Sequence, residues 1–200
     1  MTSQVDICNL ALTKLGDNRI ISLDDGTEEA DSLSAIYDLI LEDELRKRNW
    51  RFSMLRTTLP ALASTPAFGY DNQYALPSGY LRAIQVGEYF VSENLRNHTG
   101  DKTPFYTIEN NMILTDMAAP LKFRYVSSAI TPDKYDACFK NAFASRLAYE
   151  LAEDSTQSNS KRQLAKQDYI DAVNDAVVSG AIEVPAEKPQ DDSWVLARAL

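Results

Sequence analysis

With 200 residues, 44% of them apolar, the chain suits one domain or two small domains that share a core, and it is too apolar to be disordered. Its 29 acidic and 20 basic side chains leave a net charge of −9, which argues against a surface that binds nucleic acid or anionic lipid. No apolar run approaches the roughly 20 residues that cross a bilayer, and no signal-peptide pattern opens the chain, so we expect a cytoplasmic origin.

The first fifty residues predict two helices joined by a short connection. Apolar residues recur at helical spacing from Val5 to Leu15, and Gly16 stands where a C-terminal cap belongs. The second helix starts after an N-cap, Thr27, has acids in its first turn and basic residues in its last, and ends near Trp50. Its apolar stripe consists of Ala30, Leu33, Ile36, Tyr37, Ile40, Leu41 and Leu45.

Between residues 51 and 129 the pattern is typical of strands and tight turns. Phe52 and Met54 alternate with the polar residues Arg51 and Ser53, which predicts an extended segment directly after Trp50. Asn110 and Asn111 tolerate the positive φ angles of a two-residue hairpin turn. Many aromatic side chains lie in this region, and we expect them to fill its core rather than to stack on bases. Further strands are expected at about 74–76, 81–86, 105–108, 112–114 and 121–126.

Two more helices are predicted after this region. Thr131 and Pro132 suit the N-cap and the first helical position, and the apolar stripe that follows continues to about Asp154. A last helix is expected over about 161–179, with Gly180 ending it. Because the connection between them is short, these two helices should lie antiparallel.

These elements predict an α+β fold. Residues 1–50 and 130–180 would form an antiparallel helical bundle, and residues 51–129 would form a small antiparallel β module inserted into it. Trp50 and Phe52 are expected to close the core between the bundle and the β module. Residues 181–200 would be an extended C-terminal tail with four acids and a Trp194 tip. Such a tip suits either a pocket of a partner or the chain's own bundle, and the residues alone leave both open.

Few residues could support catalysis. The only histidine, His98, lies in a polar stretch that is typical of a loop. Cys8 and Cys138 have no cysteine near them in the sequence, and we expect both to be small core residues. No nucleophile elbow, phosphate loop or dinucleotide motif is present, so no cofactor or metal site is predicted. The remaining enzymatic alternative is a virion-associated cell-wall glycosidase with an Asp/Glu pair. We expect the paired acids to lie on solvated faces, among them Asp24, Asp25, Glu28, Glu29, Glu42, Asp43 and Glu44.

Taken in order along the chain, several short motifs carry a resemblance to a known family. They are LAL and LG at 10–16, RI and SL at 19–23, RNWRF at 48–52, YALP and YLR at 74–82, and SW and AR at 193–198. Together they resemble the head-to-tail adaptor family of tailed bacteriophages, which includes tail tubular protein A of short-tailed phages and related gatekeeper proteins. The segment between Ser92 and Pro104 has no counterpart in this pattern.

The resemblance implies a structural protein of the virion rather than an enzyme. Members form a ring, generally of twelve subunits, beneath the portal at the head–tail junction, after assembly in the host cytoplasm. The implied partners are the portal protein, a downstream nozzle or tail-tube protein, other copies of the chain, and genomic DNA that passes through the lumen without sequence-specific binding. Twelve copies at −9 would carry roughly −100, which would repel DNA from an acidic lumen and let it slide.

The resemblance also assigns the C-terminal tail to portal docking. The residues that would dock are Trp194, Val195, Leu196 and Arg198. The tether before them, residues 181–192, would become ordered only on assembly.

Overall fold

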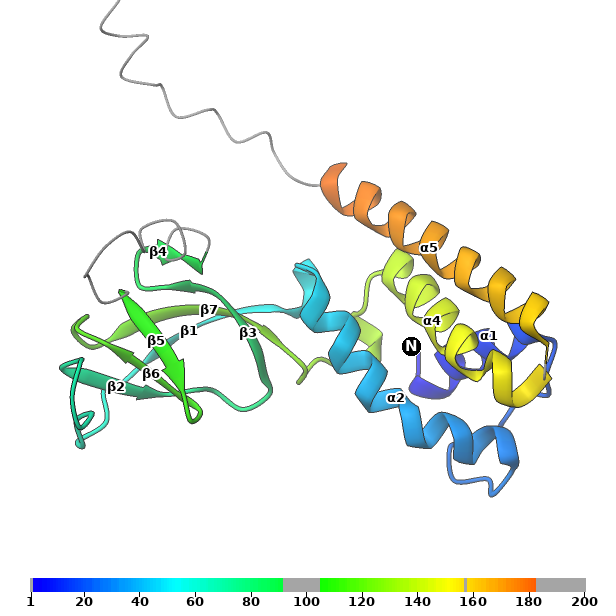
Figure 1. The fold of residues 1–200 in the computed structure, drawn as a ribbon, viewed down its shortest axis with the longest axis horizontal. Coiled ribbons are helices and arrows are strands. Elements are labelled where there is room, and N and C mark those ends of the chain that lie inside the picture. The colour runs from blue at the N-terminus through cyan, green and yellow to red at the C-terminus, as the bar shows by residue number, and fades with distance from the viewer. Residues whose placement is uncertain (1, 92–104, 157, 183–200) are drawn as a thin grey trace, which may run out of the picture.

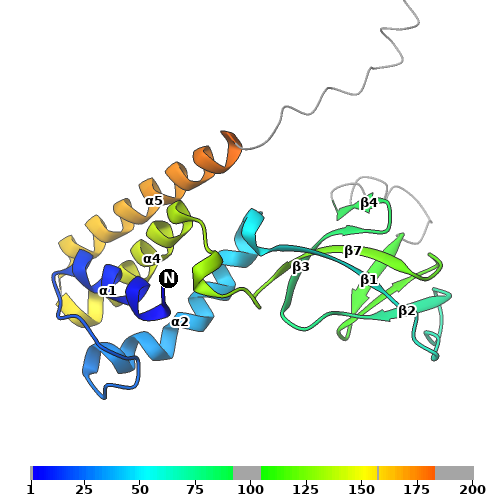
Figure 2. The same ribbon diagram turned by 180° about the vertical axis from the view of Figure 1, so that it is seen from behind.

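A computed structural model describes residues 2–91, 105–156 and 158–182 and shows the expected α+β fold (Figure 1). The helices are α1 (Gln4–Leu15), α2 (Glu28–Lys47), α4 (Ala137–Thr156) and α5 (Asn159–Ile182), with short 3-10 turns η1 (Arg51–Ser53) and η2 (Pro132–Lys134). The strands are β1 (Met54–Leu59), β2 (Asn72–Ala75), β3 (Tyr80–Val86), β4 (Tyr89–Phe90), β5 (Tyr106–Glu109), β6 (Met112–Thr115) and β7 (Leu121–Ser127). The helices lie together at one end of the long axis and the strands at the other, as Figure 2 shows from behind.

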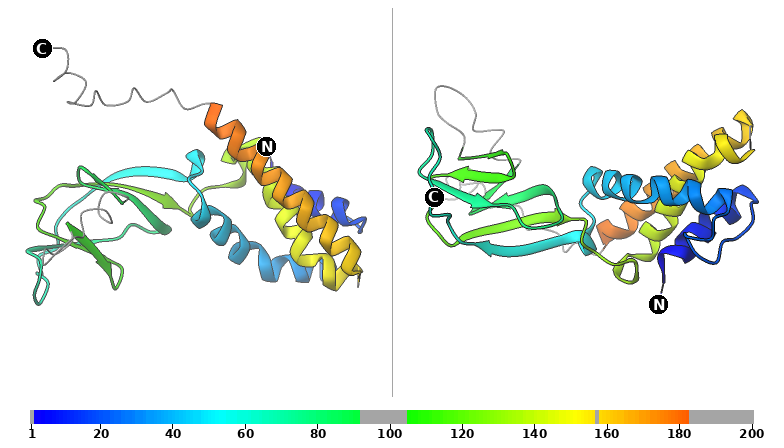
Figure 3. Two further views of the ribbon diagram at one scale, coloured as in Figure 1. Left: turned by 45° about the horizontal axis from the view of Figure 1, so that its top comes forward. Right: turned by 90° about the horizontal axis from the view of Figure 1, so that it is seen from below.

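The strands of the described residues form two antiparallel sheets. One has the order β1-β7-β3-β4 and the other has the order β2-β6-β5. The predicted hairpin is confirmed: β5 and β6 pair, and Asn110 and Asn111 have φ angles of 47° and 59° in the turn between them. β1 follows the end of α2, β7 leads back toward α4, and β1 pairs with β7 over the whole length of β1. The β region is therefore joined to the helices by two adjacent, hydrogen-bonded strands (Figure 3).

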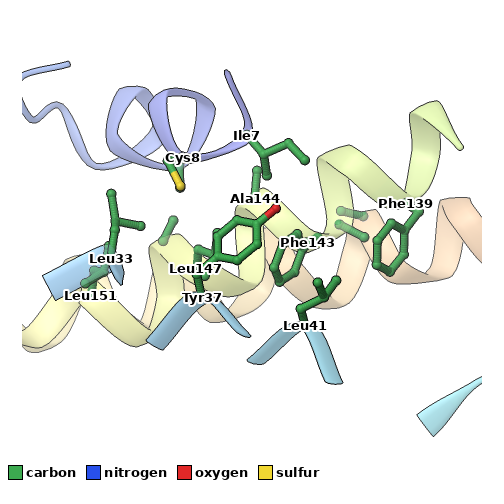
Figure 4. Close-up of a cluster of buried hydrophobic side chains, with 14 of the residues drawn as sticks. Ile7, Cys8, Leu33, Tyr37, Leu41, Phe139, Phe143, Ala144, Leu147 and Leu151 are labelled. Atoms are coloured by element: carbon green, nitrogen blue, oxygen red, sulfur yellow. The ribbon is translucent and has the colours of Figure 1, made fainter. Parts of the chain in front are cut away.

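The helical core is built around α4. Figure 4 shows its side chains facing α1 on one side and α2 on the other, with Phe143, Leu147 and Leu151 close to Tyr37 and Leu33. All of these side chains are buried. α5 packs antiparallel on α4 through small residues, which are Ala165, Ala172, Val173 and Ala176. The small alanine side chains let the two helix backbones approach closely, and the partly buried Tyr169 of α5 packs against the same core.

The predicted caps of the two N-terminal helices are confirmed, although α2 ends at Lys47, three residues before Trp50. The Thr27 side chain accepts a hydrogen bond from the Ala30 amide, as an N-cap does. Gly16 ends α1 with a φ of 82°, a left-handed conformation that costs glycine little. Asn9 closes the following connection, because its side chain bonds both the amide and the carbonyl of Ile20.

The expected helix start at Thr131 is wrong. Pro132 opens only the 3-10 turn η2, after which Tyr135 returns to extended backbone and buries its ring. α4 starts at Ala137, where Asp136 Oδ1 accepts the amides of Cys138 at 2.7 Å and Phe139 at 3.4 Å. Asp136, and not Thr131, therefore acts as the N-cap of this helix.

Two further expectations need correction. Gly180 does not end α5, which continues to Ile182, and this glycine lacks the positive φ that a capping glycine adopts. Phe52 lies in the turn η1 and not in an extended strand, because the strand begins only at Met54. The remainder of the predicted tail, residues 183–200, lies outside the described residues, as does the stretch around His98.

Alkaline pH is expected to destabilise this fold. Burial raises the pKa of Cys8, Tyr106 and Tyr135 to about 12, from ordinary values of 9.0 for the thiol and 10.0 for the phenols. At a pH between the ordinary pKa values and about 12, the unfolded chain loses protons that the folded chain keeps. The free energy of unfolding is therefore highest below about pH 9 and falls as the pH rises. The urea midpoint should drop between about pH 8 and about pH 11, and tyrosinate absorbance should appear at higher pH in the native than in the denatured chain. A midpoint that stays constant over this range would contradict the assignment.

Candidate docking groove between the bundle and the sheet

An aromatic cluster lies where the helices pass into the β region. Trp50 is 8% exposed, and its ring lies 4.8 Å from that of Phe139 in a T-shaped contact. Its indole N–H donates to the Glu44 carbonyl at 2.9 Å, which fixes the ring against the end of α2. Phe52 lies 4.8 Å from Phe139 and 5.3 Å from Tyr135, centroid to centroid. Trp50 and Phe52 therefore lie where α2 passes into η1 and β1, against the first turns of α4.

A groove of about 1030 Å³ opens beside this cluster. Four parts of the chain form it: the end of α2 with η1, the outer face of β1 and β7, the segment before α4, and the last turns of α5. Its lining residues are Arg48, Asn49, Trp50, Arg51, Phe52, Met54, Arg56, Arg124, Lys134, Asp136, Ala176, Val177, Ser179 and Gly180. Trp50, Phe52, Met54 and Val177 make part of its surface apolar.

The groove is basic, although the chain as a whole is acidic. Five of its lining side chains are cationic and only Asp136 is anionic. The Asp136 carboxylate is already used as the N-cap of α4, and Arg48 pairs with Glu44 at 3.5 Å. The groove therefore presents a local excess of positive charge in a chain with a net charge of −9.

Arg56 and Arg124 concentrate this charge. They are direct partners in the β1–β7 ladder, and both belong to the groove lining. Arg56 is exposed, and the Arg124 guanidinium forms a hydrogen bond from its Nη2 to the Met54 sulfur at 3.4 Å. Neither arginine has a carboxylate partner among the described residues. Like charges directly opposite each other weaken a sheet, so this pair favours an anionic group between them.

The sequence predicted Glu44 on a solvated face, and the structure contradicts that prediction. Glu44 is 2% exposed, at the inner side of α2. One carboxylate oxygen accepts the Tyr169 hydroxyl at 2.7 Å and lies 3.3 Å from Lys47 Nζ, and the other lies 3.5 Å from Arg48. Burial, and then this hydrogen bond, raise the pKa of the Tyr169 phenol. Glu44 is a paired structural carboxylate that ties α2 to α5, and it does not line the groove.

The Glu44–Tyr169 contact is expected to stabilise the bundle measurably. Tyr169→Phe should lower the free energy of unfolding by about 1–2 kcal/mol, because it leaves a buried carboxylate oxygen with one partner fewer. In a double-mutant cycle with Glu44→Gln, urea unfolding should give a coupling energy of about 1 kcal/mol. Tyr149→Phe is the matched control, since the Tyr149 hydroxyl has no hydrogen bond in the described structure. Purely additive single effects would mean that the hydrogen bond contributes nothing.

Sequence patterns contained signals for the residues that were missed. Glu44 follows Leu41 by three positions and Tyr37 by seven, so the helical period places it on the buried stripe. Arg56 and Arg124 each occupy the outer positions of an alternating strand. Their pairing depends on the β1–β7 register, which joins residues 68 positions apart. The sequence near either arginine does not predict that register.

The predicted portal-docking residues, Trp194, Val195, Leu196 and Arg198, lie outside the described residues. Nowhere in residues 2–91, 105–156 and 158–182 do three or more His, Cys, Asp or Glu side chains gather as metal ligands would. None of the helices in the described part of the chain is long and apolar enough to cross a bilayer.

Comparison with known proteins identifies no family. The sequence matches no protein-family model, and a search of curated proteins returns no significant match.

Proposed function

We propose that the chain is a structural adaptor of a tailed-phage virion, which forms a ring beneath the portal, extends the DNA channel and offers a platform to the tail. The short sequence motifs that resemble those of head-to-tail adaptors, taken in their order along the chain, suggest this function. The groove between the bundle and the sheet is the structural observation that carries it. An adaptor needs surfaces that receive neighbouring chains, and a partly apolar, basic groove with an unmatched arginine pair is such a surface.

The shape of the described chain also supports this proposal. The helical end and the β end are joined by the paired strands β1 and β7, and Val126 of β7 is buried in the same core as Trp50 and Phe139. Two such ends on one elongated body can contact different partners, such as the portal on one side and the tail on the other (Figure 3). In a ring, the acidic chains together would form an annulus that repels DNA and lets it slide.

The glycosidase alternative finds less support. Such an enzyme needs two carboxylates across a cleft, one of them protonated, and the groove lining contains only Asp136. That carboxylate is held by two backbone amides, and the buried Glu44 is paired away from the groove. A cell-wall zymogram should therefore show no cleared band for the wild-type chain. A band that disappears in Asp136→Asn or Glu44→Gln would favour the enzyme.

Localisation in the particle tests the adaptor function. An antibody raised against the chain, with gold detection, should label virions at the junction between head and tail in electron micrographs. Particles assembled without the chain are the control, and they should show no label and no attached tail. Label on the capsid surface or the tail tip, or tailed particles in the absence of the chain, would contradict the proposal.

A further inference from the structure

We propose that the basic groove holds an acidic segment of the same chain, residues 183–192, while the chain is unassembled. This inference concerns the isolated chain and does not depend on the phage function. It replaces, for this segment, the expectation that residues 181–192 become ordered only on assembly.

The first argument is the positive charge of two arginines in the lining of the groove. Arg56 and Arg124 face each other across β1 and β7 without a carboxylate partner in the described residues. A guanidinium pair of this kind can hold carboxylates through charge-assisted, bidentate hydrogen bonds. A carboxylate between them would also replace the repulsion of two like charges with attraction to both.

The second argument is the position of α5. Its last turns, with Ala176, Val177, Ser179 and Gly180, form one wall of the groove, and the helix ends at Ile182. The chain that follows therefore starts at the edge of the groove. Ten residues reach up to about 33 Å when extended, and a tether this short gives a local concentration in the millimolar range. The tethered segment therefore competes for the groove better than a free acidic peptide at a lower concentration does.

The third argument is the composition of the segment. Residues 183–192 contain Glu183, Glu187, Asp191 and Asp192 against a single base, Lys188. Their charge is opposite to that of the groove. Pro185 and Pro189 disfavour continuation of α5 into this segment and favour an extended chain that can lie along a groove. Duplex DNA, the other anionic occupant, needs a broad basic face, whereas the chain as a whole carries −9.

The test uses the full chain with its acids neutralised, as Glu183→Gln, Glu187→Gln, Asp191→Asn and Asp192→Asn. This variant leaves the groove open. A fluorescently labelled peptide of residues 183–192 should bind it, by anisotropy, at least about tenfold more tightly than it binds the wild-type chain, whose own segment competes. Adding Arg56→Glu and Arg124→Glu should abolish the binding. Arg56→Gln with Arg124→Gln should weaken it at least about tenfold, with less risk to the fold, which circular dichroism checks.

A matched control separates the groove from net charge. Arg19→Glu with Lys166→Glu changes the charge by the same amount at two exposed positions outside the groove lining, and it should leave the binding unchanged. Three results would overturn the proposal. They are equal binding to the wild-type and neutralised chains, binding that survives loss of both groove arginines, and binding of a short DNA duplex where the peptide does not bind.

Discussion

Replacing Trp50 with alanine is expected to lower the free energy of unfolding by about 3–5 kcal/mol, because it empties a buried aromatic site. The centroid of its ring lies 4.8 Å from that of Phe139 and 6.4 Å from that of Phe52. Its N–H donates a hydrogen bond to the backbone carbonyl of Glu44. All of these contacts lie where the helices meet the β region. The loss should therefore weaken the coupling between the two ends as well as the total stability, and urea unfolding followed by circular dichroism measures it.

Two control variants make this prediction specific. Phe68→Ala removes an aromatic side chain that is 88% exposed, and it should change the stability by less than about 0.5 kcal/mol. Trp50→Phe keeps most of the ring but not the N–H, so it should cost less than the alanine variant. An alanine variant as stable as wild type would show that the cluster does not hold the junction.

Deleting residues 183–200 is expected to leave a folded monomer that no longer joins portal rings. The fold should survive because α4 and α5 pack through residues up to Ala176, and α5 ends at Ile182. Portal binding should be lost by a factor of at least about 100, because buried aromatic anchors commonly supply most of an interface's affinity. Co-sedimentation with portal rings, together with circular dichroism of the truncated chain, measures both effects.

Point variants locate this loss within the tail. Trp194→Ala should reproduce most of the deletion, whereas the four acid-to-amide changes in residues 183–192 should leave portal binding intact. If the truncated chain binds portal rings as wild type does, the assignment of Trp194, Val195, Leu196 and Arg198 to docking is wrong.

Local signals were sufficient to predict most of the helices and strands. α1 and α2 each combine an apolar stripe with a cap residue in the expected place, Gly16 in one case and Thr27 in the other. The hairpin at Asn110 and Asn111 rests on two adjacent residues that accept positive φ. Where two signals compete within a few residues, as with Thr131 and Asp136, the burial of Tyr135 decides between them, and that burial depends on the tertiary fold.

The groove could not be predicted from the sequence. Its lining comes from four separate parts of the chain, between residue 48 and residue 180. In the sequence, the basic residues of β1 and β7 have the pattern of solvent-exposed side chains on alternating strands. Only the β1–β7 register brings Arg56 opposite Arg124. The period of α2 could have revealed the buried Glu44, but its partner Tyr169 lies 125 residues away.

The mass of the wild-type chain, alone and mixed with portal rings, tests the adaptor function most directly. Light scattering should give a monomer of 22.4 kDa for the chain alone. On portal rings we predict saturation at a fixed number of added chains, because a closed ring has a fixed number of subunits, and the family resemblance implies about twelve. A portal ring that gains no mass, or a chain that adds without reaching a fixed number, would contradict the account.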